Sequence, residues 1–133
     1  MKTRFLKWLP AIVIMLVIFM FSAQPGHEIL TFNWADRIIK KAGHMIGYGL
    51  LALSYWRVFD FKREKRSLAW LLAVLYAVTD EFHQSFVPGR NPSIWDVLIF
   101  DNFGALISLW LISYYRKEKR PDEWGPVVET TEH

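Results

Sequence analysis

Three residues with charged or reactive side chains recur at helical spacing around position 44. Lys41, His44 and Tyr48 are separated by three and then four residues, so in a helix they share one face. That face offers a fixed positive charge, a base and a hydroxyl group to its neighbours. Gly43 and Gly47 lie beside it and predict close approach of another helix. We take this face as one half of a candidate site.

The second half is the acidic run at residues 80–84, which also contains a histidine. In a helix, Asp80 lies on the same face as His83 and Gln84, whereas Glu81 is turned by about 100° toward a different neighbour. Two interpretations are open. The side chains pair with one another to satisfy a buried helix end, or they form a functional site.

Arg90 follows Pro88-Gly89 and precedes Asn91-Pro92, so its backbone is restricted on both sides. Its side chain has two interpretations. It extends along an apolar surface and only marks the membrane interface, or its planar guanidinium binds a phosphate or carboxylate through two parallel hydrogen bonds.

Two further carboxylates belong to the last apolar segment. Asp96 stands three residues after Ser93, so it is either part of a helix capping box or part of the site. Asp101 is about two turns past that cap and needs a partner inside the bilayer. The candidate partners are Arg90, Lys41 and His44.

Four apolar stretches must position these residues. They span residues 8–23, 42–59, 67–84 and 93–115, and 53% of the chain is hydrophobic. A membrane-spanning helix needs roughly 20 apolar residues, so we predict an all-α bundle of four transmembrane helices. A short interfacial helix is predicted before the second span, because Trp34, Ile38 and Ala42 recur at helical spacing. The alternative is that one or two stretches are buried helices of a soluble protein.

Threaded alternately through a bilayer, the four spans bring the polar residues to one face of the membrane. Ionisable groups at membrane depth are rare and mostly functional, so we favour a site over mutual pairing alone. The predicted ligand-binding residues are Lys41, His44, Tyr48, Asp80, Glu81, His83, Gln84, Arg90, Asp96 and Asp101, with His44, Glu81 and His83 as catalytic candidates.

The distribution of positive charge predicts the orientation. Of the sixteen Lys and Arg residues, twelve fall on the side that holds both termini, and only Arg37, Lys40, Lys41 and Arg90 fall on the other. Positively charged loops stay inside the cell, so we expect a multi-pass protein of the cell membrane with both termini in the cytoplasm. The net charge of +3 is thus a topology signal and does not indicate nucleic-acid binding.

Length and composition limit the remaining choices. At 133 residues one domain is expected, over residues 1–120, followed by a polar, disordered cytoplasmic tail at 121–133. We expect the first segment to be an uncleaved span rather than a signal peptide, because Phe21 makes a poor cleavage site. Cysteine is absent, and the histidine spacing matches no zinc pattern, so neither metal nor cofactor is expected.

Several of these motifs occur together in a known family. They are Phe-Ser-Ala-Gln-Pro at 21–25, Lys41-x-x-His44 with Tyr48, the run from Asp80-Glu81 to Pro88-Gly89-Arg90, Ser93-x-x-Asp96 and Asp101-x-x-Gly104. The chain resembles the VanZ-like family of small membrane proteins over roughly residues 21–104. The resemblance implies a cytoplasmic-membrane protein of Gram-positive type. The founding member of that family raises resistance to the glycopeptide teicoplanin, which carries a fatty-acyl chain.

Three functional hypotheses follow. In the first, an outward-facing site binds an anionic lipid headgroup, a cell-wall precursor or a glycopeptide, with Arg90, Lys41 and His44 on the anion and Asp80, Glu81 and Asp101 orienting them. In the second, the protein is a membrane enzyme that modifies such a headgroup, with His83 or His44 as base and Glu81 as its acid or orienting partner. In the third, it is a structural or accessory subunit, and the polar cluster only fixes helix packing.

Overall fold

The computed structural model describes residues 2–25 and 33–119. Within these ranges the chain forms helices joined by turns and no strand, which confirms the predicted all-α class. The elements are α1 (Lys2–Ser22), α2 (Asn33–Val58), η1 (Arg63–Lys65), α3 (Arg66–Gln84), α4 (Ile94–Asp96), η2 (Val97–Asp101) and α5 (Asn102–Lys119). The π-helical turn η2 joins α4 to α5 without a break, so the described chain has four long helical segments.

The helix predicted around Trp34 and Ile38 is present and leads directly into the second apolar stretch. The two form one continuous helix of 26 residues, α2, which begins at Asn33. No proline interrupts it, and its three glycines do not stop a helix that propagates from both sides. The polar tail predicted for residues 121–133 lies outside the described residues.

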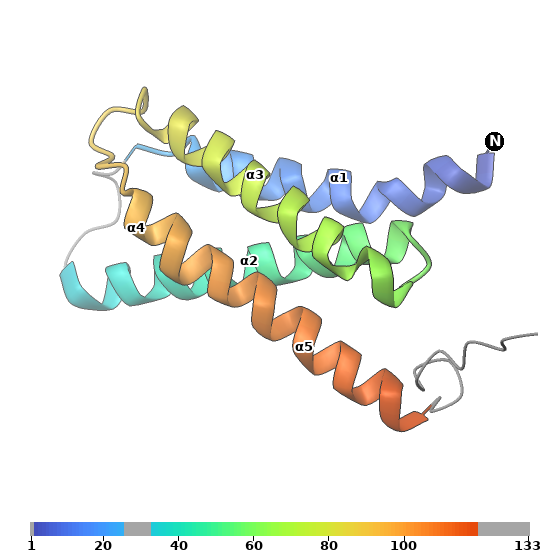
Figure 1. Ribbon diagram of the computed structural model, residues 1–133. Coiled ribbons are helices and arrows are strands. Elements are labelled where there is room, and N and C mark those ends of the chain that lie inside the picture. Colours follow the sequence, from blue (N-terminus) through green and yellow to red (C-terminus); the bar gives the residue numbers. More distant parts are fainter. Residues whose placement is uncertain (1, 26–32, 120–133) are drawn as a thin grey trace, which may run out of the picture.

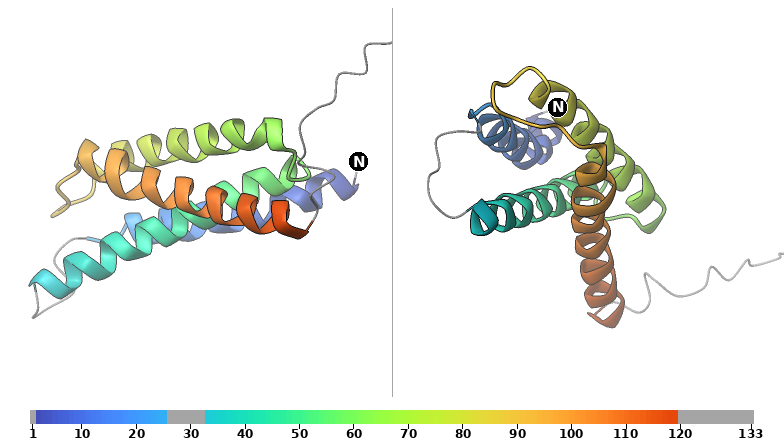
Figure 2. Two further views of the ribbon diagram at one scale, coloured as in Figure 1. Left: turned by 60° about the horizontal axis from the view of Figure 1, so that its bottom comes forward. Right: turned by 90° about the vertical axis from the view of Figure 1, so that its left-hand side faces the viewer.

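The four segments are arranged around α2, which packs against α1, α3 and α5. Figures 1 and 2 show α1 and α3 along one side of α2 and the segment from α4 to α5 crossing another. The end of the molecule at the left of Figure 1 holds the end of α1, the start of α2, the end of α3 and the start of α4. We call this the acidic end, because it carries Asp80, Glu81, Asp96 and Asp101, and we call the opposite end the basic end.

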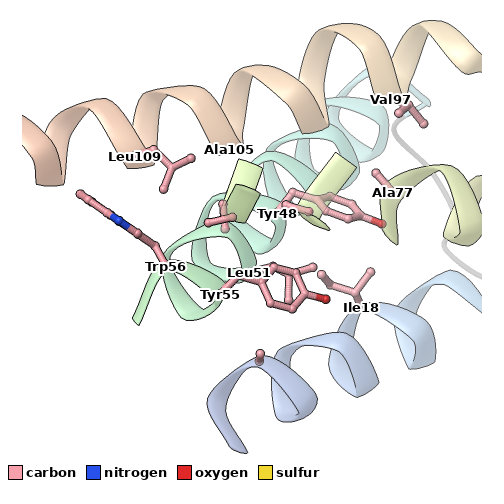
Figure 3. Close-up of a cluster of buried hydrophobic side chains, with 13 residues drawn as sticks. Ile18, Tyr48, Leu51, Tyr55, Trp56, Ala77, Val97, Ala105 and Leu109 are labelled. Carbon is pink, nitrogen blue, oxygen red and sulfur yellow. The ribbon is translucent and has the colours of Figure 1, made fainter. Parts of the chain in front are cut away.

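The core is built around a row of buried, mostly large side chains on one face of α2 (Figure 3). Its buried members are Tyr48, Leu51, Ala52, Tyr55 and Trp56. From α3 they meet Ala69, Ala73 and Ala77, which recur every four residues and are all buried. Small residues on one helix face allow the large rings of the neighbour to pack against the backbone, so α2 and α3 fit closely.

Glycine brings α2 and α5 still closer together. A Cβ on Gly49 would overlap the Ser108 hydroxyl, and one on Gly104 would overlap the carbonyl of Met45. Gly104 and Ser108 of α5 therefore lie directly against α2. The predicted pair Gly43 and Gly47 behaves differently, because a Cβ on Gly47 would only touch Ile18 of α1 at 3.4 Å and one on Gly43 would meet nothing within 4 Å.

The basic end closes through a tight turn between α2 and α3. Asp60 and Phe61 both adopt positive φ angles, 54° and 57°, and the Trp56 indole donates a 2.8 Å hydrogen bond to the Lys62 carbonyl. Lys7 of α1 forms an ion pair with Asp60, and its hydrogen bond lowers the pKa of the Asp60 carboxyl below its ordinary value. The turn thus fixes α1 beside α2 at this end.

Two helices of the described chain are long and apolar enough to cross a membrane, Arg4–Ser22 and Ile94–Lys119. Their outer faces carry large exposed apolar side chains, including Leu16, Met20, Trp110 and Leu111. Exposed apolar surface of this extent is typical of contact with lipid or a partner. These features are consistent with a membrane protein. The other two segments carry more polar residues at the acidic end, where α2 begins and α3 ends.

Candidate functional site

At the acidic end, each residue of the predicted polar face on α2 meets a carboxylate from another element. This arrangement supports the predicted common face and names its partners, which the sequence left open. The pairs are Lys41 Nζ with Asp96 Oδ1 at 3.1 Å, His44 Nδ1 with Asp101 Oδ1 at 3.7 Å, and Tyr48 OH with Asp80 Oδ2 at 3.1 Å.

Asp80 is the centre of a buried hydrogen-bond network between three helices. Its Oδ2 accepts hydrogen bonds from Ser22 Oγ at 2.7 Å, Tyr48 OH at 3.1 Å and Gln84 Nε2 at 3.0 Å. Gln84 Nε2 also lies 3.1 Å from Ser22 Oγ. Buried polar groups are stabilising when they are paired, so this network connects α1, α2 and α3. In the sequence, Ser22 stands out only as part of the Phe-Ser-Ala-Gln-Pro motif. Its partner Asp80 is 58 residues away, and no local pattern indicates this contact.

Glu81 faces away from this network, as its helical position predicts. Its carboxylate accepts a hydrogen bond from the backbone N–H of Ser93. In a capping box, that backbone group would bind the acidic residue three positions later. Ser93 makes no side-chain cap bond, and Asp96 pairs with Lys41 instead. Of the two interpretations of Asp96, the structure therefore supports membership of the polar cluster.

Arg90 binds the end of α1. Its Nη2 donates to the Phe21 carbonyl at 2.8 Å and its Nε donates to the Gln24 carbonyl at 3.2 Å. The last carbonyl groups of a helix have no partner within the helix, so a guanidinium is well suited to them. Neither sequence interpretation included this role. The bonds hold the positive charge of Arg90 in a fixed place while part of its guanidinium is used internally.

His83 lies apart from the other candidates. Its ring packs against Phe19 of α1, with centroids 4.5 Å apart, and its buried Nδ1 has no hydrogen-bond partner among the described residues. Although His83 shares a helix face with Asp80 and Gln84, it is turned toward α1. Of the two histidines predicted as bases, only His44 lies among the paired carboxylates.

Asp101 occupies the last position of the π-helical turn and is buried, with 4% of its surface exposed. Its Oδ1 accepts no hydrogen bond from a described residue. Turns of this type widen the helix locally and are frequent at functional sites. The extra residue in the turn cannot be read from hydrophobic periodicity, so the sequence analysis missed it.

Two hollows meet at this end. A polar cavity of about 150 Å³ is lined by Lys40, Lys41, His44, Glu81, Gln84, Arg90, Asn91, Asp96, Phe100 and Asp101. An apolar groove of about 380 Å³ between α1 and α2 is lined by Val17, Ile18, Phe21, Gln24, Ile39, Lys40, Gly43, His44, Ile46, Gly47 and Arg90. Lys40, His44 and Arg90 belong to both, and we call these three residues the junction.

Lys40 was not among the predicted site residues. It makes no ion pair with any residue that the structure describes, whereas the charge of Lys41 is matched by Asp96. The signal that could have found it is position: Lys40 stands four residues before His44, and residues four apart share a helix face.

The arrangement can hold a small charged group beside an apolar chain. Among the described residues, no three His, Asp or Glu side chains lie close enough together to bind a metal ion. The polar cavity offers the cations Lys40 and Arg90, the imidazole of His44, and three carboxylates, of which Asp96 pairs with Lys41 and Glu81 accepts a hydrogen bond from the Ser93 backbone. These groups bind anions or transfer protons.

The fold and the site together define a small all-helical protein with membrane-capable helices and a polar site at one end. A sequence model of the VanZ/LLP1 family matches residues 7–116. The chain therefore belongs to the VanZ/LLP1 family. No curated protein and no solved structure matches it.

Proposed function

We propose that this protein crosses the cell membrane four times, keeps both termini in the cytoplasm, and binds an anionic component of the cell envelope at its acidic end, which faces outward. The charge distribution supports the orientation, because clusters of Lys and Arg flank the helix ends at the basic end. Positively charged loops remain cytoplasmic.

The observation that carries this proposal is the junction of Lys40, His44 and Arg90. These residues border the polar cavity and the apolar groove at once. The bound anion lies between Lys40 and Arg90, with His44 as a further donor. Lys41 supports the site from the side by holding Asp96.

Asp80 has a different role. Its Oδ2 accepts hydrogen bonds from three donors and the residue lines neither hollow, so it fixes the helices around the site and does not contact the ligand. Asp101 stands behind His44, with its Oδ1 3.7 Å from His44 Nδ1, and places a carboxylate next to the ring.

The test uses the full-length protein in a neutral detergent. Native mass spectrometry would measure how much phosphatidylglycerol and phosphatidylcholine with the same acyl chains stay bound. We expect preferential retention of phosphatidylglycerol, because its phosphate is not balanced by an ammonium group. Equal retention of both lipids would contradict the proposal. In cells, protection against teicoplanin is the readout that the family suggests.

The pairing of His44 with Asp101 favours a second candidate function, acid–base chemistry on the same ligand. A histidine with a carboxylate behind it is an oriented base, and Glu81 lines the same cavity as an acid. If the protein is an enzyme, a lipid with a changed headgroup should be found in extracts of cells that contain the wild type. It should be absent from extracts of cells that contain His44→Gln. An unchanged lipid profile would leave binding as the function.

A further inference from the structure

We infer that the apolar groove between α1 and α2 holds one acyl chain of an anionic phospholipid of the surrounding membrane, whose phosphate lies at the junction. This inference rests on the proposed function and adds the class of ligand to it. The ligand is then a lipid. A soluble anion, such as a free wall polymer, would have no acyl chain to place in the groove.

The walls of the groove are suited to a hydrocarbon chain. Val17, Ile18 and Phe21 line it from α1, and Ile39 and Ile46 line it from α2. Its volume of about 380 Å³ equals roughly a dozen water-sized groups. A methylene group is of similar size, so there is space for a single chain.

Gly43 shows that none of the described residues fills this space. A Cβ at Gly43 would meet no described atom within 4 Å, although Gly43 lines the groove. An unfilled apolar gap forfeits the dispersion contacts of its walls. In a bilayer, the molecule available to fill it is the acyl chain of a lipid.

The charges select the headgroup. Lys40, His44 and Arg90 line the groove as well as the polar cavity, and none of the described residues that line the groove is acidic. Arg90 is held in place by its hydrogen bonds to Phe21 and Gln24. Fixed cations beside an apolar groove complement an anionic lipid better than a zwitterionic one.

A second groove, between α3 and α5, is larger, about 550 Å³, but it has fewer cations to bind an anionic headgroup. Among the described residues that line it, the one cation is Arg66, whose guanidinium donates to Ser113 Oγ at 3.1 Å. We therefore place the anionic lipid between α1 and α2.

The test fills the groove from Gly43. Native mass spectrometry of the full-length protein would compare the wild type, Gly43→Leu and Thr79→Leu, each with phosphatidylglycerol, phosphatidylcholine and chain-free glycerophosphoglycerol. Thr79 is exposed on α3 and lines neither hollow, so it controls for added bulk. We expect Gly43→Leu to lower phosphatidylglycerol retention about tenfold, Thr79→Leu to leave it within about twofold, and glycerophosphoglycerol to bind at least about tenfold more weakly.

Other outcomes separate the two claims. If Gly43→Leu retains phosphatidylglycerol as the wild type does, or if glycerophosphoglycerol binds equally well, the acyl chain is not in the groove, while preference for the anion keeps the proposed function. If phosphatidylglycerol and phosphatidylcholine bind equally and both are lost in Gly43→Leu, the groove holds a chain but the proposed function fails.

A second measurement covers the case in which Gly43→Leu does not fold. The chain has no cysteine, so Gly43→Cys accepts a single environment-sensitive fluorophore. Phosphatidylglycerol brominated on its acyl chain should quench this fluorophore more strongly than the matching phosphatidylcholine does. Equal quenching by the two lipids would overturn the inference.

Discussion

Asp80 and His44 lie at the same end of the molecule but differ in burial and in the contacts of their side chains. Asp80 is buried and accepts hydrogen bonds from three helices' side chains, whereas His44 is partly exposed and lines both hollows. The sequence placed both at the same end because both interrupt apolar segments. It could not separate their roles, since the difference depends on contacts with residues far away in the chain.

Removing the acceptor at Asp80 should destabilise the protein. In Asp80→Ala, Ser22, Tyr48 and Gln84 lose their shared acceptor, and each buried donor left unpaired costs about 1–3 kcal/mol. Asp80→Asn keeps one oxygen at the centre and should cost less. Thermal unfolding in detergent would give this order. An Asp80→Ala protein as stable as the wild type would contradict the structural role.

The two histidines should respond differently to the same change. His44→Leu removes a hydrogen-bond donor to the anion at the junction, worth about 1.5–3 kcal/mol, so retention of phosphatidylglycerol should fall about tenfold or more. His83→Leu should leave it unchanged, because His83 packs against Phe19 and lines neither hollow. Loss of binding in both variants, at equal membrane abundance, would contradict this assignment.

At the level of elements, hydrophobic periodicity predicted four helical segments and most of their extent, because apolar runs and charged flanks are local signals. It failed where local sequence carries no signal. The π-helical turn before α5 and the hydrogen bonds of Arg90 to the end of α1 both depend on packing between elements.

The glycines of α2 and α5 provide a test of that packing. Gly104→Ala forces a methyl group into the backbone of Met45, and overpacking of this kind typically costs about 1–3 kcal/mol. Gly43→Ala meets no atom and should stabilise α2 by roughly 0.5–1 kcal/mol through the lower backbone entropy of the unfolded chain. Thermal unfolding of both variants would measure these two changes in stability. Equal effects of the two substitutions would contradict the observed crossing of α2 and α5.

For the whole molecule, the proposed orientation follows from the positive charges, and the chain permits a direct check because it lacks cysteine. Asn91→Cys at the acidic end should react with a membrane-impermeant thiol reagent on intact cells. Lys62→Cys at the basic end should react only after the membrane is opened. Both positions are exposed. Labelling of Lys62→Cys from outside would reverse the orientation.

The central claim is that the junction binds an anionic lipid, and Lys40 is the residue that tests it most directly. It lines both hollows and pairs with no described carboxylate, so Lys40→Gln removes a charge without breaking an ion pair within the described chain. Lys62→Gln, at the basic end, removes the same charge elsewhere and is the matched control.

The deciding measurement is the ratio of phosphatidylglycerol to phosphatidylcholine retained by the two variants in native mass spectrometry. The account predicts that Lys40→Gln lowers this ratio about tenfold, which corresponds to about 1.4 kcal/mol, and that Lys62→Gln leaves it unchanged. A ratio that stays at the wild-type value in Lys40→Gln, or falls equally in both variants, would contradict the account.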